Sequence, residues 1–349
     1  AANDGAANTG AQVLSPSTAT LTGGVPVQNL QKVTAEGAVT GVNFGFNFDT
    51  IVNTNDSGQG SLRQFILNAN LLGGEASLAQ VGLSAGLENS IFMIPGAGPH
   101  VITPTSALPS LTGVATALNA ATQAGASCAV SNRSLKIVLD GSNAGINTSG
   151  LTLDAANVMV RGFAIGKFTE AGIQGTANAD HLAVTCNHLG LNADGVTLAS
   201  NGTNGLLVKA GATDLKVGGN STDERNLISG NARDGLRLEA VTTATIEGNY
   251  IGTDISGTLP RSNNREGASY AGIYAGKATT ATTPSSAITI RNNLISGNDI
   301  IAGVAPVYNV SSGIWLEGVA TATVTGNLIG TNASGTAALR NTGYGIYTK

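Results

Sequence analysis

The charged residues of this 349-residue chain are densest between residues 223 and 266, where carboxylates and arginines lie close together. Hydrolysis of a glycosidic bond needs two carboxyl groups that flank the bond. Cleavage of a uronate polymer by elimination needs a base, usually with a cation such as Ca²⁺ that neutralises the acid. The four residues of the cluster considered for these roles are Asp223, Glu224, Arg237 and Glu239. One hypothesis is therefore a polysaccharide lyase or glycoside hydrolase, with Ca²⁺ as a possible cofactor.

The same charges have a second interpretation, as ion pairs on a solvated surface. Most of them lie in turns or near an opposite charge, as Arg233 and Asp234 do, and such pairs stabilise little. The three histidines, at positions 100, 181 and 188, do not have the spacing of metal ligands. No Gly-x-Ser-x-Gly, phosphate-binding loop or Ca²⁺-binding nonapeptide occurs. We therefore expect no metal site and favour a protein without catalytic activity.

The composition points to strands and turns. Glycine contributes 48 residues, whereas charged residues make up 11% and aromatic residues 4% of the chain. Strong helix formers are scarce, which argues against a helical bundle or a coiled coil. A net charge of −4 with few cations argues against nucleic-acid binding, because phosphate contacts need clustered Lys and Arg. No apolar run reaches the roughly 18 residues that a membrane-spanning helix needs.

A sequence repeat can be recognised from residue 150 onward. Its first element is a glycine followed by an apolar residue, and it begins at Gly172, Gly205, Gly235, Gly272, Gly313 and Gly345. In most repeats a second apolar segment ends in an asparagine, and a third places an apolar pair directly after an asparagine. Strands this short cannot bury a face alone, but coils stacked at about 4.8 Å pair each strand in parallel with its equivalent one coil on. The pattern predicts an all-β fold, a parallel β-helix with three strands per coil.

Asparagines mark one equivalent turn of these repeats, at positions 187, 226, 249, 293 and 327. Asn tolerates the left-handed backbone of a sharp turn, and stacked amides can hydrogen-bond from coil to coil. We interpret these residues as structural. In a nearby loop Asp254 has Asn332 as its equivalent, and this exchange suits a turn that needs a short acceptor better than it suits catalysis.

One amphipathic helix is predicted, at residues 61–72. Ser61 is followed three residues later by Gln64, which is a capping-box pattern. The apolar stripe of the segment consists of Leu62, Phe65 and Ile66. A lone helix before a long run of strands can cover the apolar end of the stack, and we expect that position for it.

The N-terminal residues 1–52 differ from the repeats. Residues 1–24 are small and polar with hardly a charge and predict a flexible leader. Strict alternation of apolar and small or polar residues over 41–48 predicts a half-buried strand. The predicted division is a leader and strand segment at 1–52 and a β-helix at 53–349.

Five segments carry a family resemblance, in this order along the chain: 53–64, 94–104, 139–145, 225–231 and 248–258. Together they resemble large bacterial secreted or cell-surface proteins with right-handed parallel β-helix repeats, of the pectin-lyase-like superfamily. The resemblance covers about residues 41–349 and implies right-handed coils, export and surface display. It implies no single chemistry, because the superfamily contains lyases, hydrolases and plain adhesins. Residues 25–48 also resemble the last strands of an immunoglobulin-like surface module.

The residue two positions after each repeat glycine is expected to face solvent, because it alternates with buried ones. In successive coils this position holds Gln174, Leu207, Arg237, Tyr274, Trp315 and Tyr347. Aromatic faces about 5 Å apart would form a platform for sugar rings or for a protein partner. Arg237 would add a cation–π contact with Tyr274. The row from Arg237 to Tyr347, together with Glu317, is the predicted ligand or partner surface, unless residues 25–52 cover it.

The sequence leaves several points open. It ends on the first strand of a further coil, residues 345–349, with no helix after it. Either the repeats continue in a longer protein, or the bare end docks on another copy and forms a filament. In such a filament, residues 1–52 would bridge neighbouring copies by strand addition. Cys128 and Cys186 allow one disulfide or two free thiols.

The function expected from the sequence is a non-catalytic, extracellular surface or matrix protein that acts as adhesin, stalk or self-assembling fibre subunit. Its expected partners are a second copy bound head to tail, other surface proteins, or a polysaccharide. No nucleic acid, membrane span or metal ion is expected.

Overall fold

A computed structural model describes residues 49–74, 84–266, 269–278, 284–298 and 311–349, with the backbone of 13–14 and 21–22. The two short N-terminal strands, β1 (Val13–Leu14) and β2 (Leu21–Thr22), pair antiparallel. The strand predicted at 41–48 and most of the predicted leader lie outside the described residues. The boundary after residue 52 therefore stays a prediction.

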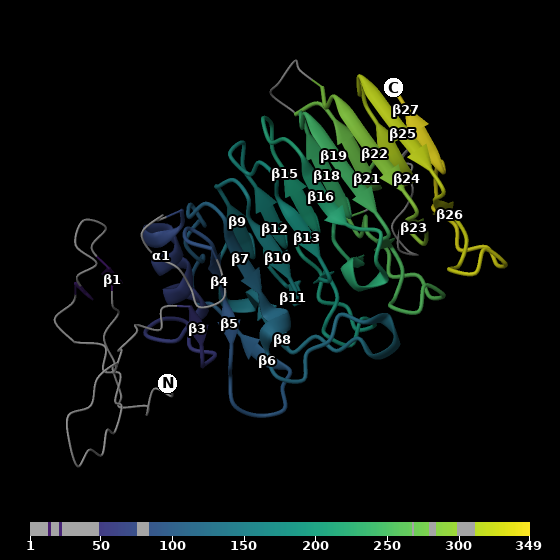
Figure 1. Ribbon diagram of the computed structural model, residues 1–349. Helices are drawn as coiled ribbons and strands as arrows, with labels where there is room; N and C mark the ends of the chain where they lie inside the picture. The colour runs from purple at the N-terminus through teal and green to yellow at the C-terminus, as the bar shows by residue number, and fades with distance from the viewer. Residues whose placement is uncertain are drawn as a thin grey trace, which may run out of the picture.

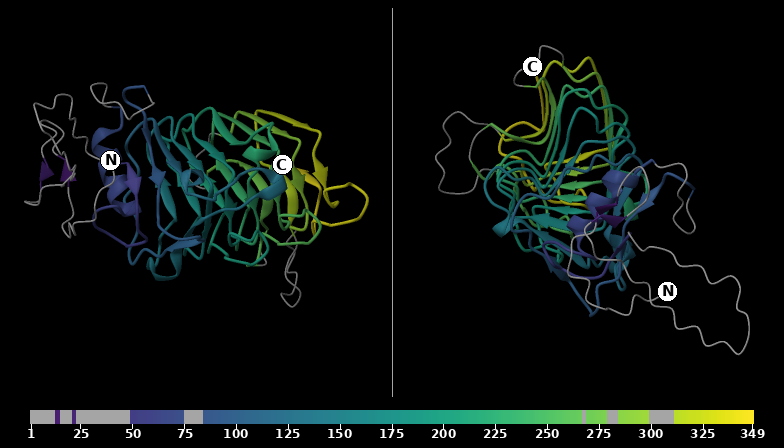
Figure 2. Two further views of the ribbon diagram at one scale, coloured as in Figure 1. Left: turned by 60° about the horizontal axis from the view of Figure 1, so that its bottom comes forward. Right: turned by 90° about the vertical axis from the view of Figure 1, so that its left-hand side faces the viewer.

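The described repeats form a right-handed parallel β-helix, in which each coil adds one strand to each of three long sheets (Figures 1 and 2). Sheet 1 consists of β9 (Leu151–Leu153), β12 (Ile173–Gly175), β15 (Leu206–Val208), β18 (Leu236–Glu239), β21 (Ala271–Gly276), β24 (Ser312–Leu316) and β27 (Ile346–Thr348). Sheet 2 consists of β4 (Glu88–Asn89), β7 (Thr116–Asn119), β10 (Met159–Arg161), β13 (Ala183–Thr185), β16 (Leu215–Gly218), β19 (Thr243–Glu247), β22 (Ala287–Arg291) and β25 (Thr321–Thr325). Sheet 3 consists of β6 (His100–Ile102), β8 (Ile137–Asp140), β11 (Phe163–Gly166), β14 (His188–Leu189), β17 (Leu227–Ile228), β20 (Tyr250–Ile251), β23 (Leu294–Ile295) and β26 (Leu328–Ile329). The predicted fold class is confirmed.

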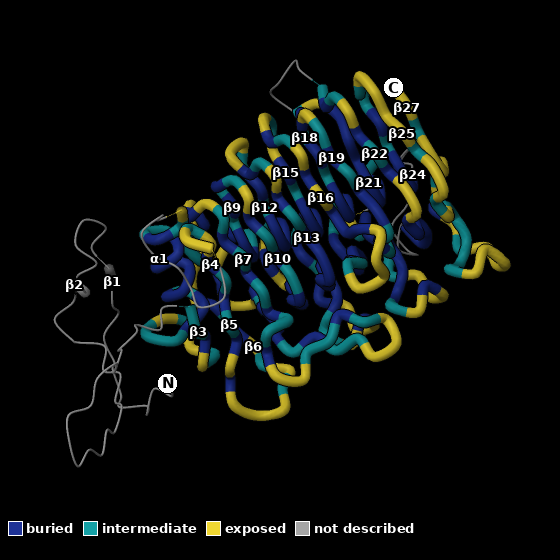
Figure 3. Tube along the Cα trace, in the orientation of Figure 1, coloured by how far each residue is buried: buried dark blue, intermediate teal, exposed yellow. Residues whose placement is uncertain are grey.

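One continuous apolar column fills the interior of the coils. Alternate residues of each strand point inward, so Ile273 and Ile314 are fully buried and pair in register. The column extends from Ile51 to Leu316. Figure 3 shows buried residues in the strands along the stack and more exposed residues in the last coil. In that coil Ile346 is 45% exposed, because β27 is the edge strand of sheet 1.

The predicted helix is α1 (Leu62–Leu72), and it covers the N-terminal end of the stack (Figure 1). Ser61 is its N-cap, and the Ser61 hydroxyl accepts a hydrogen bond from the backbone N–H of Gln64. The apolar face of α1 belongs to the same column as the strands. Next to it, β3 (Thr50–Ile51) pairs in parallel with β5 (Ile91–Phe92). The expected capping role is confirmed.

The asparagines of the predicted turn form a hydrogen-bonded ladder. Asn249 illustrates the pattern: its Oδ1 accepts from the backbone N–H and from Nδ2 of Asn226, and its Nδ2 donates to Asn293 Oδ1. The same link joins the equivalent asparagines from 187 to 327. The expected structural role is thereby confirmed.

The expectation that these asparagines themselves adopt the left-handed backbone is wrong. The left-handed conformation falls on the residue before the asparagine, with φ of +58° at Cys186, +70° at Gly248 and +57° at Asn292. The asparagines themselves serve as hydrogen-bonding groups. A second ladder, which the repeat pattern did not predict, joins Asn201, Asn231, Asn263, Asn298 and Asn341.

A disulfide joins Cys128 to Cys186, which settles the alternative left open by the sequence. It ties the loop containing η1 (Ala120–Thr122) and η2 (Val130–Asn132) to the outside of the coils. Arg133 in this loop donates hydrogen bonds to the carbonyl oxygens of Cys128, Thr222 and Arg225. Burial lowers the pKa of Arg133 to about 10, with nearby arginines acting in the same direction.

Candidate binding site on the outer face of sheet 1

The row predicted on sheet 1 forms in the expected register. Parallel pairing places Arg237 beside Tyr274, Tyr274 beside Trp315, and Trp315 beside Tyr347. The guanidinium of Arg237 lies 4.0 Å from the centroid of the Tyr274 ring. This distance is that of a cation–π contact, as the sequence predicted.

The aromatic rings do not form the flat platform that equal coil spacing suggested. The Tyr274 and Trp315 rings meet edge to face, with centroids 6.0 Å apart and planes at 65°. The Trp315 and Tyr347 rings are 5.2 Å apart at 88°. Edge-to-face packing is favourable for neighbouring rings, because their quadrupoles oppose a face-to-face sandwich. At the end of the row Tyr344, 54% exposed, stacks on Tyr347 with planes at 18°.

Tyr274 was expected in solvent, and this expectation is wrong because Tyr274 is only 5% exposed. Arg237 and Trp315 contact its ring, and its hydroxyl donates to Glu317 at 3.0 Å. Burial, together with Glu317, raises the pKa of Tyr274 to about 12. Glu317 is also 3.9 Å from Lys349 Nζ. Tyr274 is therefore the buried member of the row, whereas the side chains of Trp315 and Tyr347 are half-buried and more accessible to solvent.

A cleft of about 290 Å³ surrounds Arg237 and is lined by residues from the coils of β12 to β21. Its lining residues are Glu170, Thr203, Asn204, Leu207, Arg233, Asp234, Arg237, Glu239 and Tyr270. Leu207 and Arg237 belong to the predicted row. The other lining residues come mostly from the turns that lead into β12, β15, β18 and β21.

Charges in the cleft are largely paired. Arg237 binds Asp234 at 3.0 Å and Glu239 at 2.7 Å, and Arg233 binds Glu266 at 3.0 Å. Burial raises the pKa of Asp234 to about 6, although Arg237 opposes the shift. Burial acts to lower the pKa of Arg237, but the two carboxylates outweigh it and raise that pKa above its usual value. The cleft is therefore an ion-paired groove with a deeply buried carboxylate.

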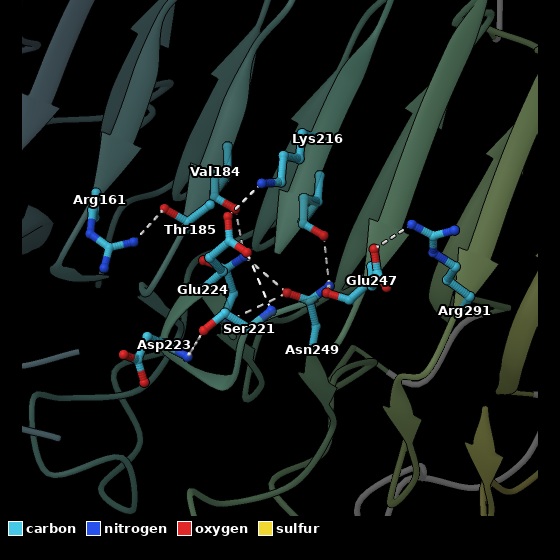
Figure 4. A network of polar contacts seen from close by, with 12 residues as sticks. Arg161, Val184, Thr185, Lys216, Ser221, Asp223, Glu224, Glu247, Asn249 and Arg291 are labelled. Atoms are coloured by element: carbon cyan, nitrogen blue, oxygen red, sulfur yellow. Dashed lines mark hydrogen bonds and ion pairs between the residues drawn. The ribbon is translucent and has the colours of Figure 1, made fainter. Parts of the chain in front are cut away.

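The four residues considered for catalysis do not form one cluster. Arg237 and Glu239 lie on β18 in sheet 1, whereas Asp223 and Glu224 lie in η4 (Thr222–Glu224). Figure 4 shows the surroundings of η4: Glu224 pairs with Lys216 of sheet 2 and closes a capping box with Ser221. The hydrogen bond from Lys216 lowers the pKa of Glu224.

The outer face of sheet 2 has a larger cavity of about 570 Å³, over β16, β19 and β22. Threonines such as Thr245 and Thr289 line it. The Arg291 guanidinium beside it binds Glu247 at 2.8 Å (Figure 4). Among the described residues no aromatic side chain lines this cavity, so it offers less to an organic ligand than the cleft on sheet 1 does.

Sequence reasoning missed four residues of the cleft: Glu170, Thr203, Asn204 and Tyr270. A signal for them existed, because Glu170, Thr203 and Tyr270 each stand two residues before a repeat glycine, as Arg233 does. They therefore form a second row beside the predicted one. Backbone hydrogen bonds from Thr203 to Glu170 and from Arg233 to Thr203 confirm the stacking.

Asp254 and Asn332, expected to be equivalent turn residues, make matching contacts. Asp254 Oδ1 accepts from the backbone N–H groups of Thr258 and Leu259. Asn332 Oδ1 accepts in the same way from the two residues four and five positions on. Their structural role is confirmed.

The described part of the chain has neither a metal-binding cluster of side chains nor a membrane-spanning helix. No three His, Cys, Asp or Glu side chains there are close enough together to hold a metal ion. No described helix has the length and apolar character to cross a membrane. In comparisons with known proteins, no family model matches the sequence, and no curated protein is significantly similar to it.

Proposed function

We propose that this chain is a non-catalytic, extracellular surface or matrix protein, a β-solenoid that acts as adhesin or stalk. It binds other molecules through the outer face of sheet 1. The observation that carries the proposal is the row in which consecutive coils place a guanidinium and three aromatic rings in contact. Arginine and aromatic side chains are enriched where protein surfaces bind partners. In a chain with 4% aromatic residues, such a row favours a binding surface.

The contacts of the cleft favour binding over catalysis. Asp234 is 1% exposed, and its two oxygens accept hydrogen bonds from Ala271 N–H and from Arg237. The same guanidinium holds Glu239. A glycosidase needs one carboxylic acid to protonate the leaving oxygen and a second carboxylate facing the sugar. A single arginine that binds both carboxylates works against this division of roles.

Two further observations support an extracellular place and a solenoid of the pectin-lyase-like type. A buried disulfide between Cys128 and Cys186 persists best in an oxidising compartment. The three-sheet coil with an internal asparagine ladder agrees with the resemblance to bacterial surface β-helix proteins. A β-solenoid also suits a stalk, because stacked coils extend in one direction.

The second candidate is a polysaccharide lyase or hydrolase. The observation that favours it is the raised pKa of Asp234, about 6, in a cleft that also holds Glu239. The test is incubation with polygalacturonate, alginate and neutral glucans, with and without Ca²⁺. We expect no unsaturated or reducing ends. Release of such ends by the wild type, abolished in Asp234→Asn, would establish the enzyme instead.

Self-association stays a prediction. Leu328 on β26 and Ile346 on β27 are exposed in the described stack, and a second copy docked on these strands would cover them. Electron microscopy of native material should show strands whose axial repeat is one molecule long. Particles of single molecules at all concentrations would remove this part of the proposal.

A further inference from the structure

We propose that the cleft on sheet 1 is a sugar-binding subsite for a glycan whose residues are uncharged or carry amino groups, and that it excludes uronates. The inference rests on the proposed function, since it names the ligand class of that binding surface. It depends on three features of the cleft: its apolar and aromatic walls, its unpaired polar groups, and its balance of charge.

The walls of the cleft suit a pyranose ring. Tyr270 lines one side, and Leu207 lines the cleft from the adjoining row. Sugar rings present a C–H face that packs against aromatic and aliphatic side chains, while their hydroxyls need polar partners at the edge. The groove follows equivalent positions of successive coils, which are about 4.8 Å apart. That step is close to the length of one sugar, so a linear glycan can run along the stack.

Polar groups without partners face this groove. The Thr203 hydroxyl is buried, the residue being 6% exposed, and has no hydrogen-bond partner. Glu170 makes no side-chain hydrogen bond or ion pair with any residue that the structure describes, nor does the side-chain N–H₂ of Asn204 donate to one. A buried hydroxyl that stays unpaired costs free energy, and rotation of the Thr203 side chain toward the cleft would let a ligand hydroxyl recover it. A carboxylate, a hydroxyl and an amide together match the donors and acceptors of a sugar.

The charges decide between kinds of sugar. Three carboxylates line the cleft, on Glu170, Asp234 and Glu239, and a fourth, Glu266, binds Arg233 beside it. They stand against the two guanidinium groups of Arg233 and Arg237. Both guanidinium groups are already bound to carboxylates, so four acids minus two cations leaves an excess of two negative charges. A uronate would bring a further negative charge and would have to break an existing ion pair. The carboxylate of Glu170, which makes no close ion pair and acts on Arg233 only at longer range, would instead attract an ammonium group.

The test compares three hexasaccharides by isothermal titration calorimetry at low salt: a chitosan oligomer, cellohexaose and an oligogalacturonate. We expect the chitosan oligomer and cellohexaose to bind, and the oligogalacturonate to bind at least about tenfold more weakly, since one lost ionic contact has about this effect. An oligogalacturonate that binds as tightly as the other two, or absence of binding by both of them, would overturn the inference.

Variants locate the site. Tyr270→Ala should weaken both favourable ligands about tenfold, by the cost of one lost stacking contact. Tyr250→Ala is the matched control, because Tyr250 also packs against an arginine but lies on sheet 3. It should bind like the wild type, with folding of both variants checked by circular dichroism.

Glu170→Gln keeps the shape of the side chain and removes its charge. It should reduce the affinity for the chitosan oligomer about tenfold and spare cellohexaose. Equal binding of all ligands by Glu170→Gln and wild type would contradict the assigned subsite. Chromatography of the same mixtures separates the two proposals: cleaved oligomers would overturn the non-catalytic function and leave the sugar class standing, whereas lost selectivity without cleavage would overturn only the sugar class.

Discussion

The asparagine ladder offers a sharp test of what holds the coils together, through the substitution Asn249→Ala. Asn249 is fully buried. Its side chain accepts two hydrogen bonds from Asn226 and donates to Val217 O, Glu247 O and Asn293 Oδ1. Alanine at position 249 leaves two donors of Asn226 without an acceptor, its backbone N–H and one N–H of its side-chain amide. At about 1–3 kcal/mol for each of these two unpaired buried groups, the loss should be about 2–6 kcal/mol.

The assay is guanidinium unfolding followed by circular dichroism, with hydrogen exchange at the strands flanking residue 249 as a local measure. Asn220→Ala is the control, because Asn220 is exposed and should change the free energy of unfolding by less than about 0.5 kcal/mol. Equal stability of the two variants, with unchanged exchange at β17 and β20, would refute the stabilising role of the ladder.

Three further predictions concern the disulfide and two buried titratable groups. Replacing Cys128 and Cys186 by serine should cost about 4 kcal/mol, since the bond closes a loop of 58 residues; an unchanged melting temperature would contradict this. Burial and the neighbouring Asp49 raise the pKa of Glu88 from 4.5 to about 8, so the folded state favours the protonated acid. Stability should therefore fall as the pH rises from about 4.5 to about 8, and Glu88→Gln should flatten this slope in thermal melts. Burial lowers the pKa of His188 from 6.5 to about 4, so the folded state favours the neutral imidazole. The contribution of His188 to the free energy of unfolding is therefore complete above pH 6.5 and is lost as the pH falls toward 4. His188→Gln should abolish this part of the loss of stability at acid pH.

The sequence was sufficient to predict the fold because it shows two periodicities, one within each strand and one from coil to coil. Alternation within strands separates inward residues such as Ile273 from outward ones such as Tyr274, and the recurring glycines mark the start of the sheet 1 strand in each coil. Together they determine which residues of different coils become neighbours. The row from Arg237 to Tyr347 could therefore be predicted with its register.

The features that the sequence did not predict depend on side-chain conformation and on loops of variable length. The ring angles and the burial of Tyr274 follow from its packing against Arg237, Trp315 and Glu317. The periodicity of the sequence does not determine this packing. The second asparagine ladder was missed because the loops between it and the next glycine vary in length. The disulfide required the path of an irregular loop across several coils.

The most direct test of the account uses Trp315, the only tryptophan of the chain, as a reporter on the outer face of sheet 1. The wild type is titrated with the chitosan hexasaccharide while tryptophan emission is recorded and binding is measured in parallel by calorimetry. The account predicts a saturable change in emission with the midpoint of the calorimetric curve, because Trp315 on β24 is one coil beyond Tyr270 and a hexamer that continues from the cleft along the aromatic row covers it. Calorimetric binding without any change in emission would show that the ligand does not reach the aromatic row and would contradict the account.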